Sequence, residues 1–174
     1  MKKDELQVVF SAEQIQDRVK ELGAEISAAY QGKQVVMVCV LKGAFLFFAD
    51  LVRHIDIDAE LDFVRLASYG SGKSRFGKVV FSKDMELPVE DKHIIIVEDI
   101  VDTGHSMNYL TEVLSKRGPR SITVCALIDK AERREVPVEV GYSGFPVKEG
   151  FLVGYGLDHA EQYRNLDGIY EIVP

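Results

Sequence analysis

Residues 94–106, with the sequence IIIVEDIVDTGHS, place carboxylates, hydroxyls and a glycine between an apolar run and a helical pattern. The apolar run predicts a strand, and the helix is expected to start near Met107. Backbone amides at such a strand-to-helix turn bind anions, and a glycine lets the chain approach a phosphate closely. The pattern therefore predicts a phosphate-monoester site formed by Asp102, Thr103, Gly104, His105 and Ser106.

An acidic pair, Glu98 and Asp99, stands where the predicted strand ends. Two carboxylates at this position can accept hydrogen bonds from a vicinal diol or hold Mg²⁺. With the phosphate turn beside them, they predict a site for a ribose 5-phosphate group. Taken singly, the pair could be solvated carboxylates, and Asp102 or Thr103 could cap the helix. The ordered combination of strand, acidic pair, Asp-Thr-Gly and helix favours the functional interpretation.

A second stretch, ASYGSGKS at residues 67–74, fits the loose pattern of a P-loop for nucleotide triphosphates. A P-loop needs a helix directly after it, because the helix start supplies the amides that hold the phosphates. The sequence after Ser74, RFGKVVFSKDMEL, predicts another strand instead. We therefore predict a hinged loop between two strands and not a triphosphate site.

The elements that would position these groups follow an α/β pattern. Ser11 and Gln14 have the spacing of a capping box, and apolar residues recur after them at helical intervals. Helical patterns also cover residues 44–55 and 107–117. Val- and Ile-rich runs of strand length occur at residues 35–41, 60–67, 78–83, 93–100 and 121–129. The alternation predicts a mainly parallel sheet with its ligands at the carboxyl ends of the strands.

Length and composition indicate one globular domain over residues 1–174, with 47% hydrophobic and 28% charged residues. The net charge of −7 argues against non-specific binding to nucleic acid or acidic lipid. Cys39 and Cys125 each lie in an apolar run and are expected to be buried, reduced thiols. The first ten residues, MKKDELQVVF, predict neither a signal peptide nor a membrane span, so we expect a cytoplasmic protein.

The stretch VEDIVDTGHS resembles the phosphoribosyl pyrophosphate signature of the type I phosphoribosyltransferases. Other motifs resemble the hypoxanthine (6-oxopurine) members of that family, in the family's order and over nearly the whole chain. The departures are His105, where Lys or Asn is common, and Ser106, where Thr is common, and both keep polar donors. The motifs are LKG at 41–43, SYG at 68–70, DK at 129–130, FLVGYGLD at 151–158 and YR at 163–164.

The resemblance implies the type I phosphoribosyltransferase fold, a mainly parallel twisted sheet flanked by helices, with a small hood built from the terminal segments. It also implies a mobile catalytic loop at about residues 68–79, which would close over the substrate and exclude water. The stretch that fits the P-loop pattern would then be the lid of a different phosphate site.

The family's site residues carry over to matching positions. Asp102 would be the general base that takes a proton from the purine. The departing pyrophosphate would be held by Lys42, Gly43, Arg164, Ser68 and Tyr69. The purine would be bound by Lys130, Phe151, Leu152 and Asp158, and Mg²⁺ by Glu98, Asp99 and Asp158. Without the resemblance, Lys42 would be read as a solvated cation, Arg164 as a surface helix residue, Phe151 as a core residue and Asp158 as a helix cap.

The implied activity is purine salvage, in which phosphoribosyl pyrophosphate and hypoxanthine, with guanine as a second substrate, give IMP or GMP and pyrophosphate. The resemblance also implies a homodimer or homotetramer. An alternative is a regulatory module that senses phosphoribosyl pyrophosphate or nucleotide, as pyrimidine-operon attenuation proteins do. A regulator that binds RNA should have a basic face, whereas this chain is acidic and keeps the candidate base, lysine and phenylalanine.

Overall fold

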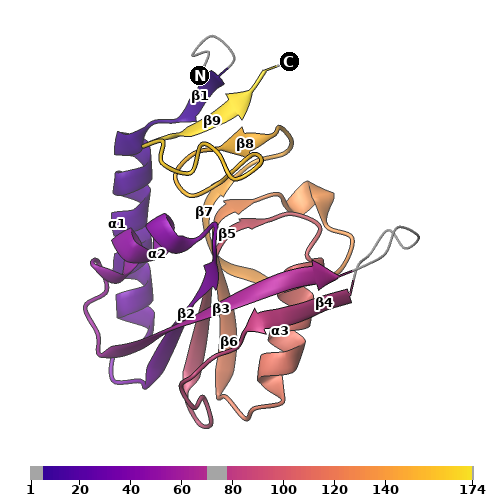
Figure 1. Cartoon of the computed structure of the whole chain (residues 1–174). Coiled ribbons are helices and arrows are strands. Elements are labelled where there is room, and N and C mark those ends of the chain that lie inside the picture. The colour runs from indigo at the N-terminus through magenta and orange to yellow at the C-terminus, as the bar shows by residue number, and fades with distance from the viewer. Residues whose placement is uncertain (1–5, 70–77, 174) are drawn as a thin grey trace.

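The computed structural model of the chain describes residues 6–69 and 78–173. Its body is a six-stranded sheet in the order β4-β3-β2-β5-β6-β7 (Figure 1). All neighbouring strands in it are parallel except β4, which pairs antiparallel with β3. The prediction of a mainly parallel sheet is confirmed. The strands are β2 (Val35–Leu41), β3 (Ala59–Tyr69), β4 (Lys78–Lys83), β5 (His93–Val101), β6 (Ser121–Asp129) and β7 (Val140–Pro146).

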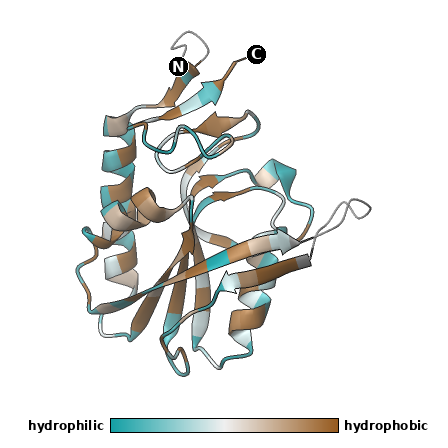
Figure 2. Cartoon of the chain, in the orientation of Figure 1, coloured by the Kyte–Doolittle hydropathy of each residue, from teal (hydrophilic) through white to brown (hydrophobic). Residues whose placement is uncertain are grey.

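Helices cover both faces of this sheet, which is why its central strands are mainly apolar. Helices α1 (Ala12–Ala29) and α2 (Phe45–Val52) enclose one core with the sheet, and α3 (His105–Ser115) encloses the other. Figure 2 shows the strands between them as mainly hydrophobic, with hydrophilic segments such as the one in β3. Ser11 and Gln14 form the expected capping box at the start of α1. Helix α2 is shorter than the predicted span of 44–55, and α3 begins two residues before Met107.

A separate small sheet forms the predicted hood. It joins β1 (Leu6–Phe10), β9 (Ile169–Ile172) and β8 (Leu152–Val153) in the order β1-β9-β8, with antiparallel pairing throughout. Leu152 and Ile169 are buried in the core that α1 and α2 share, so the hood is fixed to the body (Figure 1).

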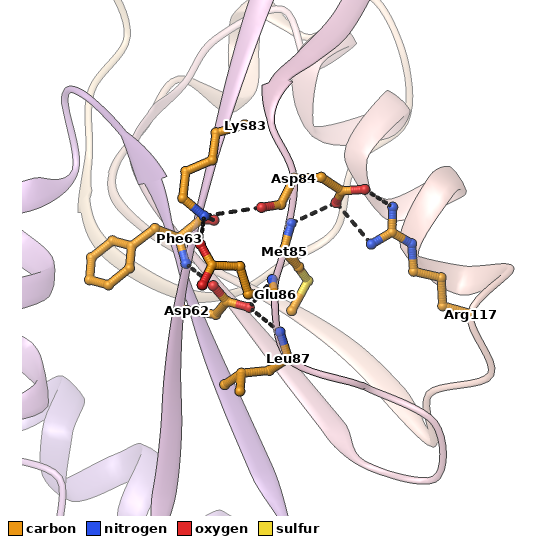
Figure 3. A network of polar contacts seen from close by, with 8 residues as sticks. All are labelled: Asp62, Phe63, Lys83, Asp84, Met85, Glu86, Leu87 and Arg117. Atoms are coloured by element: carbon orange, nitrogen blue, oxygen red, sulfur yellow. Dashed lines mark hydrogen bonds and ion pairs between the residues drawn. The ribbon is translucent and has the colours of Figure 1, made fainter.

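The base of the β3–β4 hairpin is tied down by the polar network drawn in Figure 3. The buried carboxylate of Asp62 accepts hydrogen bonds from the amides of Phe63, Glu86 and Leu87 at 2.7–2.8 Å. Asp84 accepts hydrogen bonds from both terminal nitrogens of Arg117, at 2.9 and 2.7 Å. Arg117 lies just beyond the end of α3. These contacts connect the hairpin with the helix that begins at the phosphate turn.

The hairpin also tests the two interpretations of ASYGSGKS. Strand β4 follows this stretch, so the helix that a P-loop requires is not there. Ser68 and Tyr69 pair with Val79 and Lys78 as the ends of β3 and β4. The rest of the predicted catalytic loop, residues 70–77, lies outside the described residues.

The structure also describes the two cysteines and the hydropathy of the helices. Cys39 and Cys125 are buried free thiols, and burial, more than any neighbouring charge, raises the pKa of each to about 12. Among residues 6–69 and 78–173, no helix is long and apolar enough to cross a membrane.

Candidate active site

The carboxyl ends of the parallel strands and the start of the hood surround an open pocket of about 650 Å³. Side chains from the end of β5, from the residues after β6 and from β8 reach the pocket. Ligands of open α/β sheets commonly bind at the carboxyl ends of the strands, as here. Six residues predicted from the sequence line this pocket, although they come from segments far apart in the chain. They are Asp99, Asp102, Lys130, Phe151, Leu152 and Asp158.

The phosphate turn follows β5 directly and leads into α3. Gly104, at the N-cap of this helix, has a φ of 92°, and no side chain caps the helix. A side chain at this position would also come within 3.0 Å of the Val136 carbonyl oxygen, so glycine is required. Since no side chain covers them, the first amides of α3 are available to an anion. Asp102 and Thr103 therefore do not cap the helix, which removes the structural alternative for them.

A short segment, residues 131–136, holds this turn in place, and we call it the brace. Arg134 donates from Nη1 to the carbonyl oxygens of Val101 (2.8 Å) and Asp102 (2.6 Å), and its second terminal nitrogen, Nη2, pairs with the Asp129 carboxylate. The amides of residues 135 and 136 donate to the Thr103 carbonyl oxygen at 2.9 and 3.3 Å. The imidazole of His105 lies 2.9 Å from a carboxylate oxygen of Glu135.

Sequence reasoning missed the brace. Its only signal was the charged run AERRE, residues 131–135, directly after the carboxyl end of a predicted strand.

Asp102 lines the pocket, and one of its carboxylate oxygens is held in an ion pair without an aligned hydrogen bond. This oxygen, Oδ1, is buried, and among the described residues no donor is aligned with it. Nε of Arg133 approaches it to 2.8 Å as an ion pair without hydrogen-bond alignment. An ionised carboxylate has several acceptor sites, so Asp102 can accept from an N–H group of a ligand as well as from Arg133.

The acidic pair at the end of β5 is packed against the loop that follows β2. Glu98 is 8% exposed and accepts a hydrogen bond from the Asp99 amide at 3.0 Å. Burial, followed by the charge of Asp99, raises the pKa of Glu98 well above its ordinary value. A Cβ on Gly43 would lie 1.7 Å from Asp99 Oδ2, so only glycine permits this close approach. The structure thus brings Gly43 of the LKG motif to the acidic pair.

The purine-side residues divide into a buried cation and an exposed ring. Lys130 is 4% exposed, and its ammonium donates to the Gly150 carbonyl oxygen at 2.7 Å. Burial lowers the pKa of Lys130, and the charge of Asp102 partly opposes this effect. Phe151 is 53% exposed with its ring edge-on to His159, 5.2 Å between centroids. Phe151 is therefore not a core residue, and its ring is free to stack on a flat ligand.

The cations predicted to hold pyrophosphate, Lys42 and Arg164, meet at one carboxylate that the sequence did not single out. Glu161 accepts from Lys42 at 3.0 Å and from Arg164 at 3.3 Å. Arg164 also pairs with Asp158 at 3.0 Å and donates to the Gly156 carbonyl oxygen at 2.7 Å. A cluster of charged contacts thus joins the LKG loop to the segment after the pocket.

The alternative interpretations of this segment are wrong. Residues 159–166 form turns and isolated bridges, not a helix, so Arg164 is not on a surface helix. Asp158 accepts from the Glu161 amide at 2.8 Å, and so caps a turn. Ser68 is exposed at the end of β3 and does not line the pocket, and nothing further is described of the Tyr69 side chain.

Comparison with known proteins agrees with this geometry. Residues 10–160 match the family model described as "Phosphoribosyl transferase domain". Hypoxanthine phosphoribosyltransferase of Haemophilus influenzae is 42% identical, covering 99% of this chain and 98% of its own length. Hypoxanthine-guanine phosphoribosyltransferase of Bacillus subtilis is 44% identical over 100% of this chain and 97% of its own length.

A crystal structure of a hypoxanthine phosphoribosyltransferase from Staphylococcus aureus superposes with a TM-score of 0.94. Its sequence is 40% identical, and the alignment covers 98% of this chain and 94% of that one. Fold, site and family model together define the class, the type I phosphoribosyltransferases. Within that class, the chain belongs to the hypoxanthine phosphoribosyltransferase family.

Proposed function

We propose that this protein is a purine-salvage enzyme that transfers the 5-phosphoribosyl group of phosphoribosyl pyrophosphate to hypoxanthine and guanine. The products are IMP or GMP and pyrophosphate. One observation carries the proposal: a single pocket beside the phosphate turn contains the carboxylate of Asp102, a buried ammonium on Lys130 and an exposed ring on Phe151. The names of the bacterial relatives, which specify hypoxanthine or hypoxanthine and guanine, support the choice of base.

In this reaction the bond between the anomeric carbon and pyrophosphate breaks, and pyrophosphate leaves with the electron pair. A purine ring nitrogen forms the new bond to that carbon, and the purine must lose a proton. The carboxylate of Asp102, which lines the pocket and pairs with the half-exposed Arg133, accepts this proton. A positioned base of this kind contributes about 10²- to 10⁴-fold to the rate.

Lys130 and Phe151 select and orient the base. Lys130 has only donors, so it favours a 6-oxygen over a 6-amino group, and its burial strengthens this discrimination. The ring of Phe151 stacks on the purine, and the backbone of Leu152 in β8 meets the purine edge. This arrangement favours hypoxanthine and guanine over adenine.

The residues of the phosphate turn, from Asp102 to Ser106, bind the 5′-phosphate, and Glu98 with Asp99 binds the ribose hydroxyls. Lys42, Gly43 and Arg164 hold pyrophosphate. Ser68 and Tyr69, at the end of β3, would contact the same pyrophosphate, and the rest of the predicted catalytic loop lies outside the described residues.

We further propose Mg²⁺ as the cofactor, with one ion held by Glu98 and Asp99 and a second by Asp158. Within the described parts of the chain, no cluster of three or more His, Cys, Asp or Glu residues could form a protein cage. The donor set nevertheless fits, because Mg²⁺ is usually held by one or two carboxylates together with substrate oxygens and water. Bound there, Mg²⁺ would act as a Lewis acid that neutralises charge on pyrophosphate.

A homodimer or homotetramer in the cytoplasm completes the proposal. Phe45 on α2 and two residues of β3, Leu61 and Phe63, are 37–44% exposed, and Phe63 stacks edge-on with Phe48 of α2. This exposed apolar surface supports self-association.

The test is to mix the protein with Mg²⁺, phosphoribosyl pyrophosphate and one of four bases, hypoxanthine, guanine, xanthine or adenine, and to follow nucleotide formation. We expect product with hypoxanthine and guanine and little with adenine. Absence of product with every base would overturn the proposal, and tight binding of phosphoribosyl pyrophosphate without turnover would favour the regulatory alternative.

A further inference from the structure

Glu161 stands between the two cations that the proposed function gives to pyrophosphate. One of its carboxylate oxygens lies 3.0 Å from Nζ of Lys42, and the other lies 3.3 Å from Nη2 of Arg164. A carboxylate that bridges two cations with two oxygens uses the same donors that a phosphate group would use. Hydrogen bonding to Lys42, ahead of the opposing effect of desolvation, lowers the pKa of Glu161, which agrees with a charged partner for both cations.

The backbone around Glu161 is unusual in a way that fixes this placement. Ala160, Glu161 and Tyr163 all have positive φ, at 50°, 64° and 74°. Such conformations are unfavourable in a residue other than glycine and persist only where surrounding contacts enforce them. Here the Asp158 carboxylate accepts from the Glu161 amide at 2.8 Å, and residues 159 and 162 form two backbone hydrogen bonds.

The contacts of Glu161 differ from those of Arg164 in how easily they can be exchanged. The Arg164 side chain is 19% exposed and also holds Asp158 and the Gly156 carbonyl oxygen, so it stays in place without Glu161. The Glu161 side chain is 64% exposed, and Lys42 is 45% exposed. An exposed ion pair of this kind contributes little to stability and can be broken by a competing anion.

We propose that Glu161 is a built-in competitor of pyrophosphate: its carboxylate occupies the Lys42–Arg164 pair, gives way when pyrophosphate oxygens bind, and returns as pyrophosphate leaves. This inference rests on the proposed function and deepens it. Glu161 is not a catalytic residue, because it does not touch the reacting carbon. It lowers the affinity for pyrophosphate and so makes release of this product easier.

The test compares magnesium pyrophosphate binding, by calorimetry at low salt, in the wild type and in Glu161→Gln. The substitution keeps the size of the side chain and the amide that binds Asp158, but removes the charge. We expect affinity to rise about 3- to 10-fold, with the gain shrinking at 0.5 M salt because screening weakens the competition. The matched control is Glu112→Gln, a helix carboxylate that is also 64% exposed and paired with a lysine at 3.1 Å, and it should leave affinity unchanged.

A double-mutant cycle with Lys42→Met separates competition between Glu161 and pyrophosphate from any damage to the turn at residues 158–161. In the Lys42→Met background, Glu161→Gln should have a clearly smaller effect, because only the competition at Arg164 remains. Unchanged or weaker binding in Glu161→Gln, or an equal effect in both backgrounds, would overturn the inference. Nucleotide formation is measured on the wild type in parallel, so a protein that binds pyrophosphate but makes no nucleotide refutes the proposed function and not the role of Glu161.

Discussion

The phosphate turn and the Lys42–Arg164 pair both serve anions at the same end of the sheet, but the chain holds them by different means. In the turn, the carbonyl oxygens of Val101 and Asp102 are bound by Arg134, whose side chain is 15% exposed. At the cation pair, the contacts run between side chains, and the shared carboxylate of Glu161 is 64% exposed. One site is fixed through the backbone, and the other through a partner that can be replaced.

This difference matches what happens to the two anions in the proposed reaction. The 5′-phosphate stays attached to the ribose in substrate and product, so a rigid turn can hold it throughout the transfer. Pyrophosphate has to arrive with the substrate and leave as a separate product. A fixed site suits the first anion, and a site with an internal competitor suits the second.

Removal of the Arg134 side chain should have the largest effect on stability. Arg134→Met leaves two carbonyl oxygens and the Asp129 carboxylate without their partner, so we expect a loss of about 2–4 kcal/mol in the free energy of unfolding. Urea denaturation measures it. Arg117→Met is the control, since Arg117 also pairs with an aspartate but is 33% exposed, and it should lose about 1 kcal/mol. Equal losses would mean that the turn is not specially braced.

A buried carboxylate outside the site, Asp62, extends the comparison to contacts that only stabilise. Burial opposes ionisation of Asp62, but the amides of Leu87, Phe63 and Glu86 outweigh it and hold its pKa below the ordinary value. Asp62→Asn should therefore lower the free energy of unfolding by about 1–2 kcal/mol at neutral pH. An asparagine side chain is uncharged and has a single acceptor oxygen, so it cannot accept all three hydrogen bonds.

The pH dependence of this loss has a definite sign. A carboxyl group whose pKa is lower in the folded state stabilises the fold above its unfolded pKa, and the contribution disappears as the pH falls through the folded pKa. The gap between wild type and Asp62→Asn should thus narrow as the pH falls below the ordinary value of 3.8. The exposed Asp58→Asn serves as control in the same urea series. A gap that is constant with pH would show that the charge of Asp62 is not what stabilises the hairpin base.

The smallest effect on stability is expected at Lys42. Its side chain is 45% exposed, and within the described parts of the chain it pairs only with the exposed Glu161, so Lys42→Met should change the free energy of unfolding by less than about 0.5 kcal/mol. Its affinity for magnesium pyrophosphate should nevertheless fall about tenfold or more, because a charge-assisted contact is lost. Calorimetry and urea denaturation of one preparation give both numbers, and a large loss of stability would contradict the idea of a replaceable partner.

Much of the fold could be predicted because burial determined the sequence pattern. The continuous apolar runs at 35–41 and 121–129 coincide with β2 and β6, since both faces of these strands are covered. The residues at the ends of such runs were expected at the site, and Asp99, Asp102 and Lys130 do line one pocket. Phe151, Leu152 and Asp158, which line it too, were expected there only from the family resemblance.

Side-chain pairing across long distances could not be predicted. Lys42 and Glu161 are 119 positions apart, and Arg134 and Asp102 are 32 apart, with no periodicity that connects them. The stretch HAEQYRNL has a composition compatible with a helix, but tertiary contacts hold it in left-handed turns. These contacts could be identified only from the structure, in which the sheet and the hood bring the segments together.

The central claim is that Asp102 accepts the purine proton and that the turn to which Asp102 belongs holds the phosphoribosyl group rigidly. The substitution Asp102→Asn tests this claim most directly. Phosphoribosyl pyrophosphate binding and single-turnover IMP formation are measured on the same preparation with Mg²⁺ and hypoxanthine. We expect binding within about threefold of the wild type and a rate of IMP formation lower by about 10²-fold or more. An unchanged rate would remove Asp102 from this role, and an equal loss of binding would mean that its carboxylate supports the turn instead.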